Sequence, residues 1–476
     1  MTTTLLVVSL VVLAGCSTYT DRMYDAHRAF AGGDVEKAIG HVNSEIDVVE
    51  IDGLPVDLDN ENTLFLLERA TMLQAIGKYD SAARDMITVD DRLEWVDIRS
   101  DRTDQVLRFI YSDAAGTYSA PAHERLLINA MNMINFMAQG RHNSARVEAR
   151  RFDILQRYFL DDQSADIIPD ILGLGNYLAA AAFEANGQFR EAARFYTAAY
   201  LHGTWPESED RLLDLLAMTG YRGSGLGELP DSAHQLFDRA RQRPSMSRSE
   251  YHQTHLLGDT LIVVQTGLVP YLEPERLGME RAIVRGLHSP YAALHLDSET
   301  RNMATTLYSA GQLNWINTTS LSHQGLPPRR RVVLEAGGQR LSLRSPIDLA
   351  TQVEEAWKAV SATALAAAIS RAVARAVAGE GARSVAQSVA ESSERTEGAS
   401  RAIGWIAGSV TKTTLSARDR PDTRSWTTLP ADVHLVRMQL PQGPQRIQIQ
   451  VNGRFDHRDA TIHDDRFHVF NFSRLR

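Results

Sequence analysis

The stretch GLGNYLAAAAFEANGQFREAARFYTAAYLHGTWP, residues 173–206, decides the fold. It contains two runs rich in alanine, a strong helix former, and Gly187 separates them. Ala180 and Ala192 are small enough to let two helices approach closely. A glycine at position 187 can end the first helix, and the bulky Phe189 can fill the turn. The stretch therefore predicts two antiparallel helices joined by a tight turn.

The same spacing recurs elsewhere in the first half of the chain. Alanine stands seven residues before a glycine, a bulky apolar residue follows the glycine by two positions, and a second alanine follows it by five. Two further copies have these residues: Ala26, Gly33, Val35 and Ala38, then Ala70, Gly77, Tyr79 and Ala82. Gly140 to Ala145 repeats the second half, with His142 as the bulky residue. A recurring unit of this kind indicates stacked helix pairs, and an irregular helical bundle is the alternative.

Residues 173–206 resemble a tetratricopeptide repeat. The resemblance rests on small and aromatic residues at the family's positions, namely Ala180, Phe183, Gly187, Phe189, Ala192, Tyr196 and Ala199, with Pro206 closing the unit. The family's tryptophan and leucine-glycine positions are not matched, as Asn176 and Ala179 show, and the four glycines are unevenly spaced. The resemblance implies a degenerate helical solenoid over residues 16–257, whose concave surface binds a peptide or protein segment.

From residue 258 onward the pattern changes from helices to short strands. Alternating or β-branched runs, several of them beside glycine or proline, predict strands at 261–264, 331–335, 339–343, 433–438, 446–451 and 467–472. Ala336-Gly337-Gly338, between the second and third of these runs, indicates a hairpin. Strands this short do not stand alone, so we expect residues 258–348 and 416–476 to form one small antiparallel β-sandwich. The predicted fold class is α+β and mainly α.

An alanine-rich stretch, residues 349–415, interrupts the predicted β-domain. Alanine favours helix, and Gly379-Glu380-Gly381 would divide the stretch into two helices. Ile369, Val373 and Val377 form a narrow apolar stripe on the first of them. We expect a helical hairpin inserted in the β-domain, and a surface that docks on lipid or on a partner is the alternative.

Residues 1–15 have the pattern of a signal peptide, because an apolar run too short to span a membrane ends on small residues. Leu13-Ala14-Gly15-Cys16 resembles the bacterial lipobox, which implies cleavage before Cys16 and acylation of its sulfur. The first four residues carry no Lys or Arg, and an ordinary signal peptide with an incidental cysteine is the alternative. Ser17, in place of the aspartate that retains lipoproteins in the inner membrane, favours the outer membrane.

Composition argues against several classes of function. The net charge is −9, from 50 basic and 59 acidic residues with no basic block, so nucleic acid is not an expected partner. Cys16 is the only cysteine, so the chain cannot form an intramolecular disulfide. No Gly-x-Ser-x-Gly elbow, phosphate-binding loop or His-Glu-x-x-His motif occurs, and we expect neither a catalytic residue nor a cofactor.

Three groups of residues are weak candidates for sites. His252, His255 and Asp259 would share one helical face and could hold a divalent metal, although surface histidines on helices are commoner. Arg424 and Trp426 could form a partner-binding hot spot; alternatively, their segment, Asp422 to Pro430, fixes the helical hairpin to the sheet. The third group is predicted to lie together in a loop or at a strand edge: His457, Asp459, His463, Asp464 and Asp465.

Several segments are similar to a family of uncharacterised Gram-negative bacterial lipoproteins with helical repeats. The similar segments are residues 123–125, 145–151, 261–270 and 422–430. The resemblance implies a cell-envelope function, with the peptidoglycan-synthesis machinery as a suggested partner. We therefore expect an outer-membrane lipoprotein that faces the periplasm and acts as a non-enzymatic adaptor in envelope assembly or maintenance. An assembly lipoprotein of the outer-membrane-barrel or pilus-secretion type and a cell-wall hydrolase are the alternatives.

Overall fold

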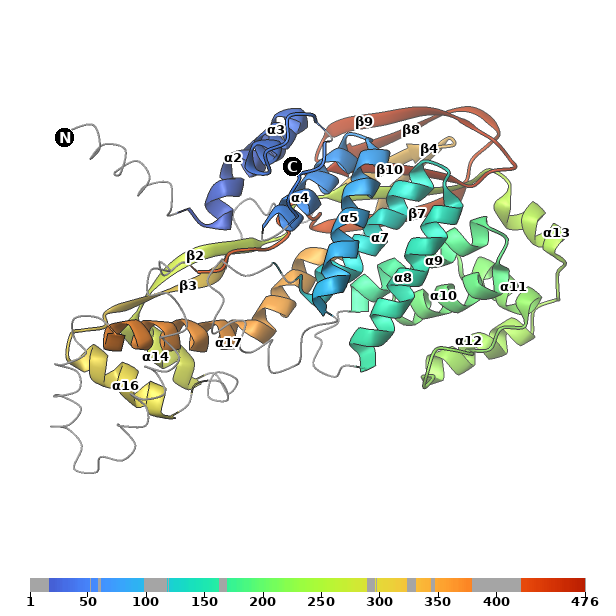
Figure 1. Cartoon of the computed structure of the whole chain (residues 1–476). Helices are drawn as coiled ribbons and strands as arrows, with labels where there is room; N and C mark the ends of the chain where they lie inside the picture. The colour runs from blue at the N-terminus through green and yellow to red at the C-terminus, as the bar shows by residue number, and fades with distance from the viewer. Residues whose placement is uncertain are drawn as a thin grey trace.

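The computed structural model describes residues 17–51, 53–58, 61–97, 118, 120–161, 169–288, 296, 298–322, 331–343, 347–378 and 421–475. This part of the chain is mainly helical and contains several small sheets, so the predicted mainly helical α+β class is confirmed at that level. Figure 1 shows helices that follow one another along the sheets, and an arm that projects from the body. The predicted signal peptide and Cys16 lie outside the described residues.

The first half of the chain consists of helices that pack on their neighbours in sequence (Figure 1). They are α2 (Tyr19–Gly32), α3 (Val35–Glu45), α4 (Asn62–Ala75), α5 (Tyr79–Asp97), α7 (Ala122–Ala138), α8 (His142–Asp161), α9 (Pro169–Ala185), α10 (Phe189–Leu201), α11 (Glu209–Thr219), α12 (Asp231–Arg241), α13 (Arg248–Tyr251) and the π-helical turn η1 (His252–Leu256). Ala180 of α9 and Ala192 of α10 are fully buried, as their small size predicted.

The four glycines of the recurring spacing each follow the first helix of a pair and adopt a left-handed conformation. Their φ angles are 82° at Gly33, 77° at Gly77, 69° at Gly140 and 68° at Gly187. In each turn, the N–H of the residue after the glycine donates to the carbonyl five positions earlier, as from Gln188 to Phe183 at 3.0 Å. This hydrogen bond closes the helix end in the way that a glycine cap allows. The prediction that these glycines end helices is confirmed.

Helices α8 and α9 pack together at Gly175, which lacks room for a side chain. A Cβ on Gly175 would overlap the ring of Phe152, which is fully buried in α8. We expect Gly175→Ala to lower the free energy of unfolding by about 1–3 kcal/mol, since overpacking shifts the two helices apart. Urea unfolding followed by circular dichroism measures this loss.

The control for this prediction is Gly40→Ala in α3, where no atom lies within 4 Å of the added Cβ. Alanine has the higher helix propensity, so this variant should be unchanged or more stable by about 0.5–1 kcal/mol. Equal losses in the two variants would contradict the close packing of α8 on α9.

The strands of the second half form two four-stranded sheets and one two-stranded ribbon. The first sheet has the order β10-β1-β7-β6, with β10 (His468–Arg474), β1 (Asp259–Thr266), β7 (Asp432–Gln439) and β6 (Ile347–Asp348). The second sheet has the order β5-β4-β8-β9, with β5 (Gln339–Leu343), β4 (Val332–Ala336), β8 (Gly443–Val451) and β9 (Arg454–Ile462). The predicted hairpin at residues 331–343 is confirmed as β4 and β5.

One detail of the predicted β-domain is wrong. Strand β1 pairs in parallel with β10, whereas an antiparallel arrangement was expected throughout. This pairing joins distant segments, and local alternation does not determine it. Strands β7 and β8 flank a short turn but lie in different sheets. After β7, the N–H of Leu440 donates to the carbonyl of Gly258 at 2.9 Å, and the chain then enters the second sheet.

The first sheet is buried on both faces, between the helices and the second sheet. All eight residues of β1 are buried. Leu261 and Val263 belong to the core shared with the helices, whereas Ile262 and Val264 belong to the core shared with the second sheet. This double burial explains why β1 is a continuous apolar run rather than an alternating one.

The arm is a separate small unit that the sequence did not predict. Its elements are β2 (Tyr271–Gly278), α14 (Met279–His288), α16 (Ser298–Ser309), β3 (Trp315–Ser322) and α17 (Leu349–Ala378). Strands β2 and β3 pair with each other, and the three helices close a core around Leu307, Ile369 and Val373. The arm takes residues that were expected in the β-domain, because the helical periodicity of α14 and α16 was overlooked.

Helix α17 corresponds to the first half of the predicted helical hairpin. It begins at Leu349, the predicted boundary, and Ile369 and Val373 of the apolar stripe pack inside the arm. Residues 379–415, the rest of the predicted hairpin, lie outside the described residues. In the described part of the chain, a membrane-spanning helix is not found; only the bent pair Leu349–Lys358 and Val360–Ala376 satisfies the length and composition of a span.

Candidate functional site

The densest set of buried polar side chains joins the helices to the first sheet, and we call it the inner interface. The helices contribute Glu68, Gln74, Glu124, Glu184 and Arg211; the β-part contributes Asp259, Gln265, Trp426, Thr427, Thr428 and Arg437. All of these side chains are less than 9% exposed. Such groups remain buried only where they are paired or hydrogen-bonded, so their geometry shows what holds the two halves together.

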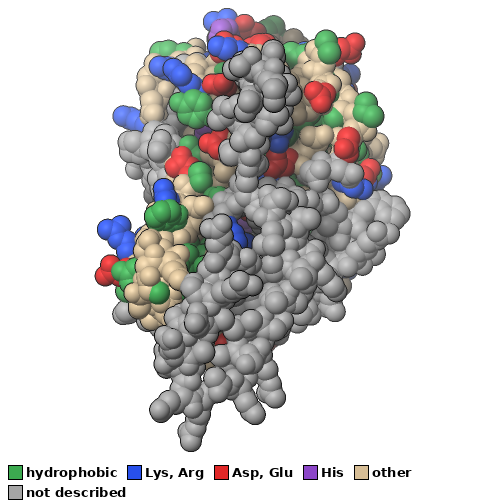
Figure 2. Space-filling view, turned by 60° about the vertical axis from the view of Figure 1, so that its left-hand side comes forward, with side chains coloured by type: hydrophobic (Ala, Val, Ile, Leu, Met, Phe, Trp, Pro, Cys, Tyr) green, Lys and Arg blue, Asp and Glu red, His purple; other side chains and the backbone are tan. Residues whose placement is uncertain are grey.

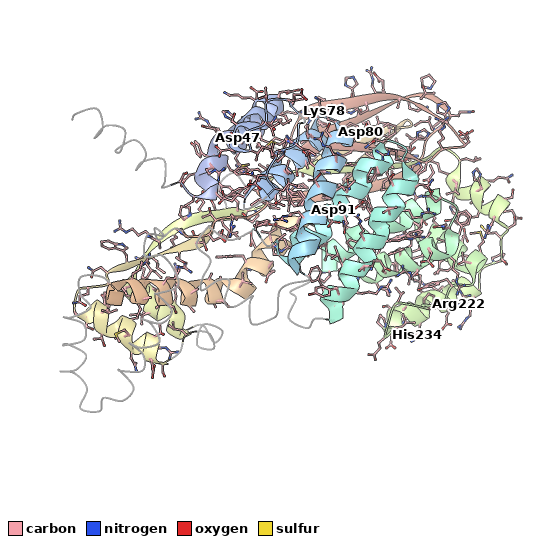
Figure 3. All side chains as sticks on the ribbon, in the orientation of Figure 1. Asp47, Lys78, Asp80, Asp91, Arg222 and His234 are labelled. Carbon is pink, nitrogen blue, oxygen red and sulfur yellow. The ribbon has the colours of Figure 1, made fainter. Side chains whose placement is uncertain are left out.

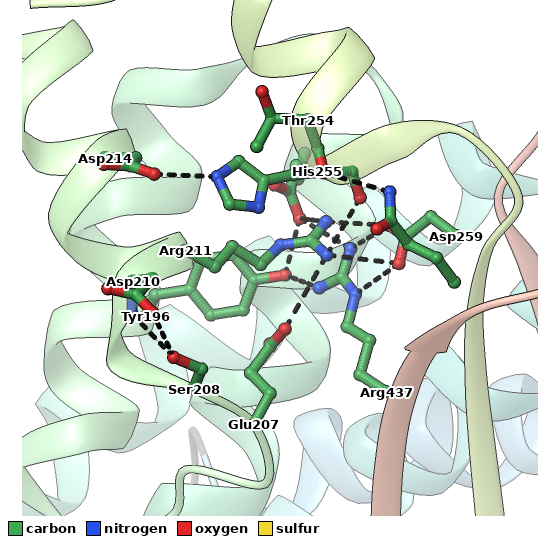
Figure 4. A network of polar contacts seen from close by, with 12 residues as sticks. Tyr196, Glu207, Ser208, Asp210, Arg211, Asp214, Thr254, His255, Asp259 and Arg437 are labelled. Atoms are coloured by element: carbon green, nitrogen blue, oxygen red, sulfur yellow. Dashed lines mark hydrogen bonds and ion pairs between the residues drawn. The ribbon is translucent and has the colours of Figure 1, made fainter. Parts of the chain in front are cut away.

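Two arginines and two carboxylates form an ion cluster at one end of the inner interface (Figure 4). Arg211 of α11 and Arg437 of β7 each reach Asp259 of β1, with Nη2–Oδ2 distances of 2.7 Å and 2.6 Å. Both guanidinium groups also contact Glu184 Oε2 of α9, at 3.1 Å and 2.7 Å. Glu207 Oε2 also lies 3.7 Å from Arg211 Nη1, so the two guanidinium groups face three carboxyl groups. Burial alone would raise the pKa of Asp259, but Arg211 and Arg437 outweigh it and hold that pKa at about 2.

Tyrosine hydroxyls complete the coordination of the cluster. Tyr251 donates to Glu184 Oε1 at 2.6 Å, and Tyr196 donates to Glu184 Oε2 at 2.7 Å. Both rings are fully buried, so they also keep water from the charges. A buried ion pair is stable only with this degree of hydrogen bonding, because each ion has lost its hydration.

The predicted metal candidates do not come together. Asp259 begins β1 and is held by the two arginines, so it does not share a helical face with the histidines. His255 lies in η1 and its Nε2 is 3.0 Å from Asp214 Oδ2, whereas His252 is exposed. No cluster of three or more His, Cys, Asp or Glu that could hold a metal is found within the described ranges. The prediction from helical spacing is wrong because the helix ends at Leu256, before Asp259.

A second part of the inner interface consists of two buried glutamates that bind the backbone of residues 426–428. The N–H groups of Thr427 and Thr428 donate to the two oxygens of Glu68 at 2.8 Å and 2.9 Å. The N–H of Trp426 donates to Glu124 Oε1 at 2.9 Å. Three consecutive backbone N–H groups thus point at two carboxyl groups, an arrangement that favours negative charge.

The prediction of an exposed hot spot at Arg424 and Trp426 is wrong. Trp426 is 1% exposed, and its indole N–H donates to Thr71 Oγ1 of α4 at 3.0 Å. The Arg424 side chain is 5% exposed and pairs with Asp422, with Nη2–Oδ2 at 2.7 Å. The alternative, that the segment is a latch, is closer to the structure. The latch holds helices α4 and α7. Just after it, the carbonyl of Ala431 accepts from the N–H of Ala350 in the alanine-rich helix at 3.0 Å.

An amide chain crosses the middle of the inner interface. Gln74 of α4 accepts from Gln265 of β1 at 2.8 Å and donates to Asn135 of α7 at 2.8 Å. The carbonyl oxygen of Gln265 in turn accepts from Ser473 of β10 at 3.2 Å. Two helices and two strands are therefore connected by neutral groups between the two charged parts.

Glu124 should give the chain a pH-dependent stability. Burial raises its pKa from 4.5 to about 7; the hydrogen bonds from Trp426 and Tyr118 oppose this, and the negative charge of Glu68 adds to it. The folded chain thus binds this proton more tightly than the unfolded chain. The resulting stabilisation is fully present below pH 4.5 and is lost as the pH rises through about 7.

The matched variant is Glu124→Gln, which keeps an oxygen for the Trp426 N–H but cannot ionise. Between pH 4.5 and pH 8, we expect the wild-type chain to lose on the order of 2 kcal/mol more stability than this variant. Urea midpoints measured across this range give the difference. Parallel pH profiles for the two proteins would show that Glu124 keeps an ordinary pKa.

Sequence analysis missed every ionised group of the inner interface except Asp259. Glu184 and Arg437 each stand alone among apolar residues, as in Ala182-Phe183-Glu184-Ala185 and Leu435-Val436-Arg437-Met438, whereas Glu68 follows an apolar run and precedes Arg69. A single charge in a run that must be buried is the available signal, since such a charge needs a buried partner. The signal marks the residue but does not identify its partner.

The remaining candidates lie apart from the inner interface. Asp459 of the edge strand β9 pairs with Arg446, with an Nε–Oδ1 distance of 2.7 Å and both side chains mostly exposed. His463 contacts His468 through backbone N–H and carbonyl groups, at 3.0 Å and 3.1 Å. These contacts suit the charged edge of a sheet, which discourages pairing with another chain.

Comparison with other proteins adds no assignment to this geometry. No family model, no curated protein and no solved structure matches the chain. The inner interface itself binds parts of the chain to each other: its carboxylates accept, and its guanidinium groups donate, within the chain. This arrangement therefore fixes the first sheet against the helices.

Proposed function

We propose that the chain is a lipoprotein of the outer membrane, anchored through Cys16, facing the periplasm, and serving as a non-enzymatic adaptor in the cell envelope. The lipobox at residues 13–16 carries the proposal. Its support from the fold is the start of α2 at Tyr19, because a folded domain that begins just after the modified cysteine is held close to the membrane. We also propose membership in the lipoprotein family that the sequence resembles.

We further propose that the helix pairs are degenerate tetratricopeptide-like repeats in a short solenoid, and that the two four-stranded sheets form a sandwich. The identical glycine turns after α2, α4, α7 and α9 support the repeats. The hydrophobic core shared by the two sheets supports the sandwich. The strands from residue 259 onward favour the adaptor over an assembly lipoprotein, since that class is wholly helical.

In this proposal the partner binds an outer surface, because the inner faces of the helices hold the chain's own sheet. Helix α8 offers exposed apolar side chains at helical spacing: Val147, Ile154 and Tyr158 are 49%, 67% and 54% exposed. Arg150 and Arg157 are exposed on the same helix. A protein segment with apolar and acidic side chains fits this surface.

Metabolic labelling with radioactive palmitate tests the anchor. We expect label on the wild-type chain in outer-membrane fractions, and we expect Cys16→Ser to remove the label and release the chain into the soluble fraction. Ser17→Asp is the matched control, which should keep the label and move the chain to the inner membrane. A wild-type chain without label would contradict the proposal.

Photo-crosslinking in cells tests the adaptor. A photoreactive amino acid at Ile154 should capture a cell-envelope protein that mass spectrometry identifies, whereas one at the buried Phe152 should capture none. Absence of a captured protein from Val147, Ile154 and Tyr158 alike would contradict the use of this surface.

A further inference from the structure

The loop between α3 and α4, residues 46–61, holds aliphatic side chains in solvent. Val49 and Val56 are fully exposed, at 100% and 108%, and Leu54 is 44% exposed. The loop is nevertheless fixed to the body: Ile46 is 2% exposed, and Val48, Ile51 and Leu58 pack against the same core. The described loop residues thus divide into a set that anchors the loop and a set that faces outward.

Both ends of this loop are tied to the first turn of α2. Arg22 Nε lies 2.6 Å from Glu45 Oε2, at the end of α3, and Arg22 Nη1 pairs with Glu61, at the start of α4. Asn43 Nδ2 also donates to the carbonyl of Glu50 at 2.9 Å, which fixes the path of the loop. The loop therefore lies where the described chain begins.

The start of α2 is rigid, and it is close to the proposed lipid. Thr18 caps the helix: its hydroxyl accepts from the Asp21 N–H at 3.3 Å, and its own N–H donates to the Asp21 carboxylate at 2.8 Å. Cys16 precedes Thr18 by two residues, which is at most about 7 Å of extended chain. An acyl chain on that sulfur would hold the membrane surface beside this end of the molecule.

We infer that the loop inserts Val49, Leu54 and Val56 into the phospholipid bilayer beside the anchor. The inference rests on the proposed acylation of Cys16. Each valine that moves from water into the bilayer improves the partition by about tenfold. The aliphatic side chains lie beside the proposed anchor, so their insertion would add bilayer contact to that of the lipid.

The charged residues of the loop indicate which lipid headgroup it would contact. Asp47, Glu50 and Asp57 are exposed among the three aliphatic residues, and Figure 3 shows Asp47 at the upper left of the body, away from Arg222 and His234 at its lower right. The space-filling view shows hydrophobic and acidic side chains lying together on the upper part of the body (Figure 2). Carboxylates at headgroup level suit the ammonium group of phosphatidylethanolamine and are repelled by anionic lipid. A zwitterionic ethanolamine surface is therefore the occupant that we assign.

A fluorescent label on a new cysteine tests this inference. Cys16 is the only native cysteine, so when its sulfur is acylated, Val56→Cys supplies the one free thiol for an environment-sensitive dye. The full-length protein is purified from membranes and reconstituted in vesicles made mainly of phosphatidylethanolamine. Ile154→Cys on α8, at a position that is 67% exposed, is the matched control.

We expect the dye at position 56 to shift to shorter wavelength and to be quenched by lipids that carry a nitroxide on the acyl chain, with no such change at position 154. If the protein binds vesicles but the dye at position 56 stays in water, the inference is wrong and the proposed anchor is unaffected. A bare Cys16 in the intact mass overturns the anchor and the inference together. Protection of position 56 in cells but not in vesicles assigns the loop to a protein partner and also overturns it.

Discussion

Replacing Arg437 by methionine is expected to lower the free energy of unfolding by about 3–5 kcal/mol. Arg437 is 7% exposed and contacts both Asp259 and Glu184, so its loss leaves Arg211 facing two buried carboxylates. When one partner is removed from a buried ion cluster, the loss of stability exceeds the net contribution of the ion pair. The remaining charge stays buried, with neither its partner nor water to stabilise it. Urea unfolding of the purified chain, followed by circular dichroism, measures the effect.

Arg446→Met is the matched control for this prediction. Arg446 lies on β8 and pairs with Asp459 at 2.7 Å, but both side chains are more than 60% exposed. An exposed ion pair contributes about 0–1 kcal/mol, so this variant should unfold almost as the wild type does. Adding Asp259→Asn to Arg437→Met should cost less than the sum of the two single changes, since they share one cluster. Equal, small losses from Arg437→Met and Arg446→Met would show that the cluster is open to water.

Replacing Trp426 by alanine should cost about 3–5 kcal/mol of stability, which is the usual cost of removing a large buried aromatic side chain. The ring is 1% exposed in the core shared by the helices and the first sheet. Loss of the ring leaves a cavity between the helices and the first sheet. It also removes the indole N–H that donates to the Thr71 hydroxyl. We expect a lower thermal midpoint and, in limited proteolysis, earlier cleavage near residues 421–431.

Trp315→Ala is the control for Trp426→Ala. Trp315 is 50% exposed at the start of β3 and is covered on one face by Arg276, whose Cζ lies 3.7 Å from the ring centre. A half-exposed cation–π contact contributes about 0.5–1 kcal/mol, so the loss should be several times smaller. A Trp426 variant as stable as the Trp315 variant would mean that the segment is not seated between the helices.

Local patterns in the sequence were sufficient for most elements. The turns at Gly33 and Gly187 were predicted because a glycine after an alanine-rich run determines a helix end over a few residues. Strand β1 and the β4–β5 hairpin were predicted because β-branched runs and Gly337-Gly338 are equally local signals. The region of β9 was predicted only as a loop or strand edge, because Arg454, Asp456, Arg458 and Asp459 interrupt its alternation.

Assembly of these elements could not be predicted from one sequence. The parallel pairing of Thr260–Thr266 with His468–Arg474 joins segments about two hundred residues apart, and no local pattern encodes such a pairing. Trp426 was predicted to be exposed, but it is buried through a contact with α4, which lies more than three hundred residues earlier. Glu68 and Glu184 lie on helices, and their partners, residues 427–428 and Arg437, lie far along the chain. The sequence alone therefore does not identify these pairs.

These contacts change what the helical half can be expected to do. A helical repeat array commonly binds a peptide on its inner face. Here Glu68 and Glu124 bind the backbone of residues 426–428, and Glu184 binds Arg437, so the helices hold the chain's own β-part in that place. Under the proposed function, contacts with the envelope are therefore expected on outer surfaces, such as α8 and the loop after α3.

Hydrogen–deuterium exchange of the intact wild-type chain tests most directly whether the β-part fills the inner face of the helices. Because Glu68 and Glu124 accept the N–H groups of residues 426–428, we predict that these amides exchange as slowly as those of α4 and β1. Rapid exchange at residues 426–428, while α4 stays protected, would contradict the account.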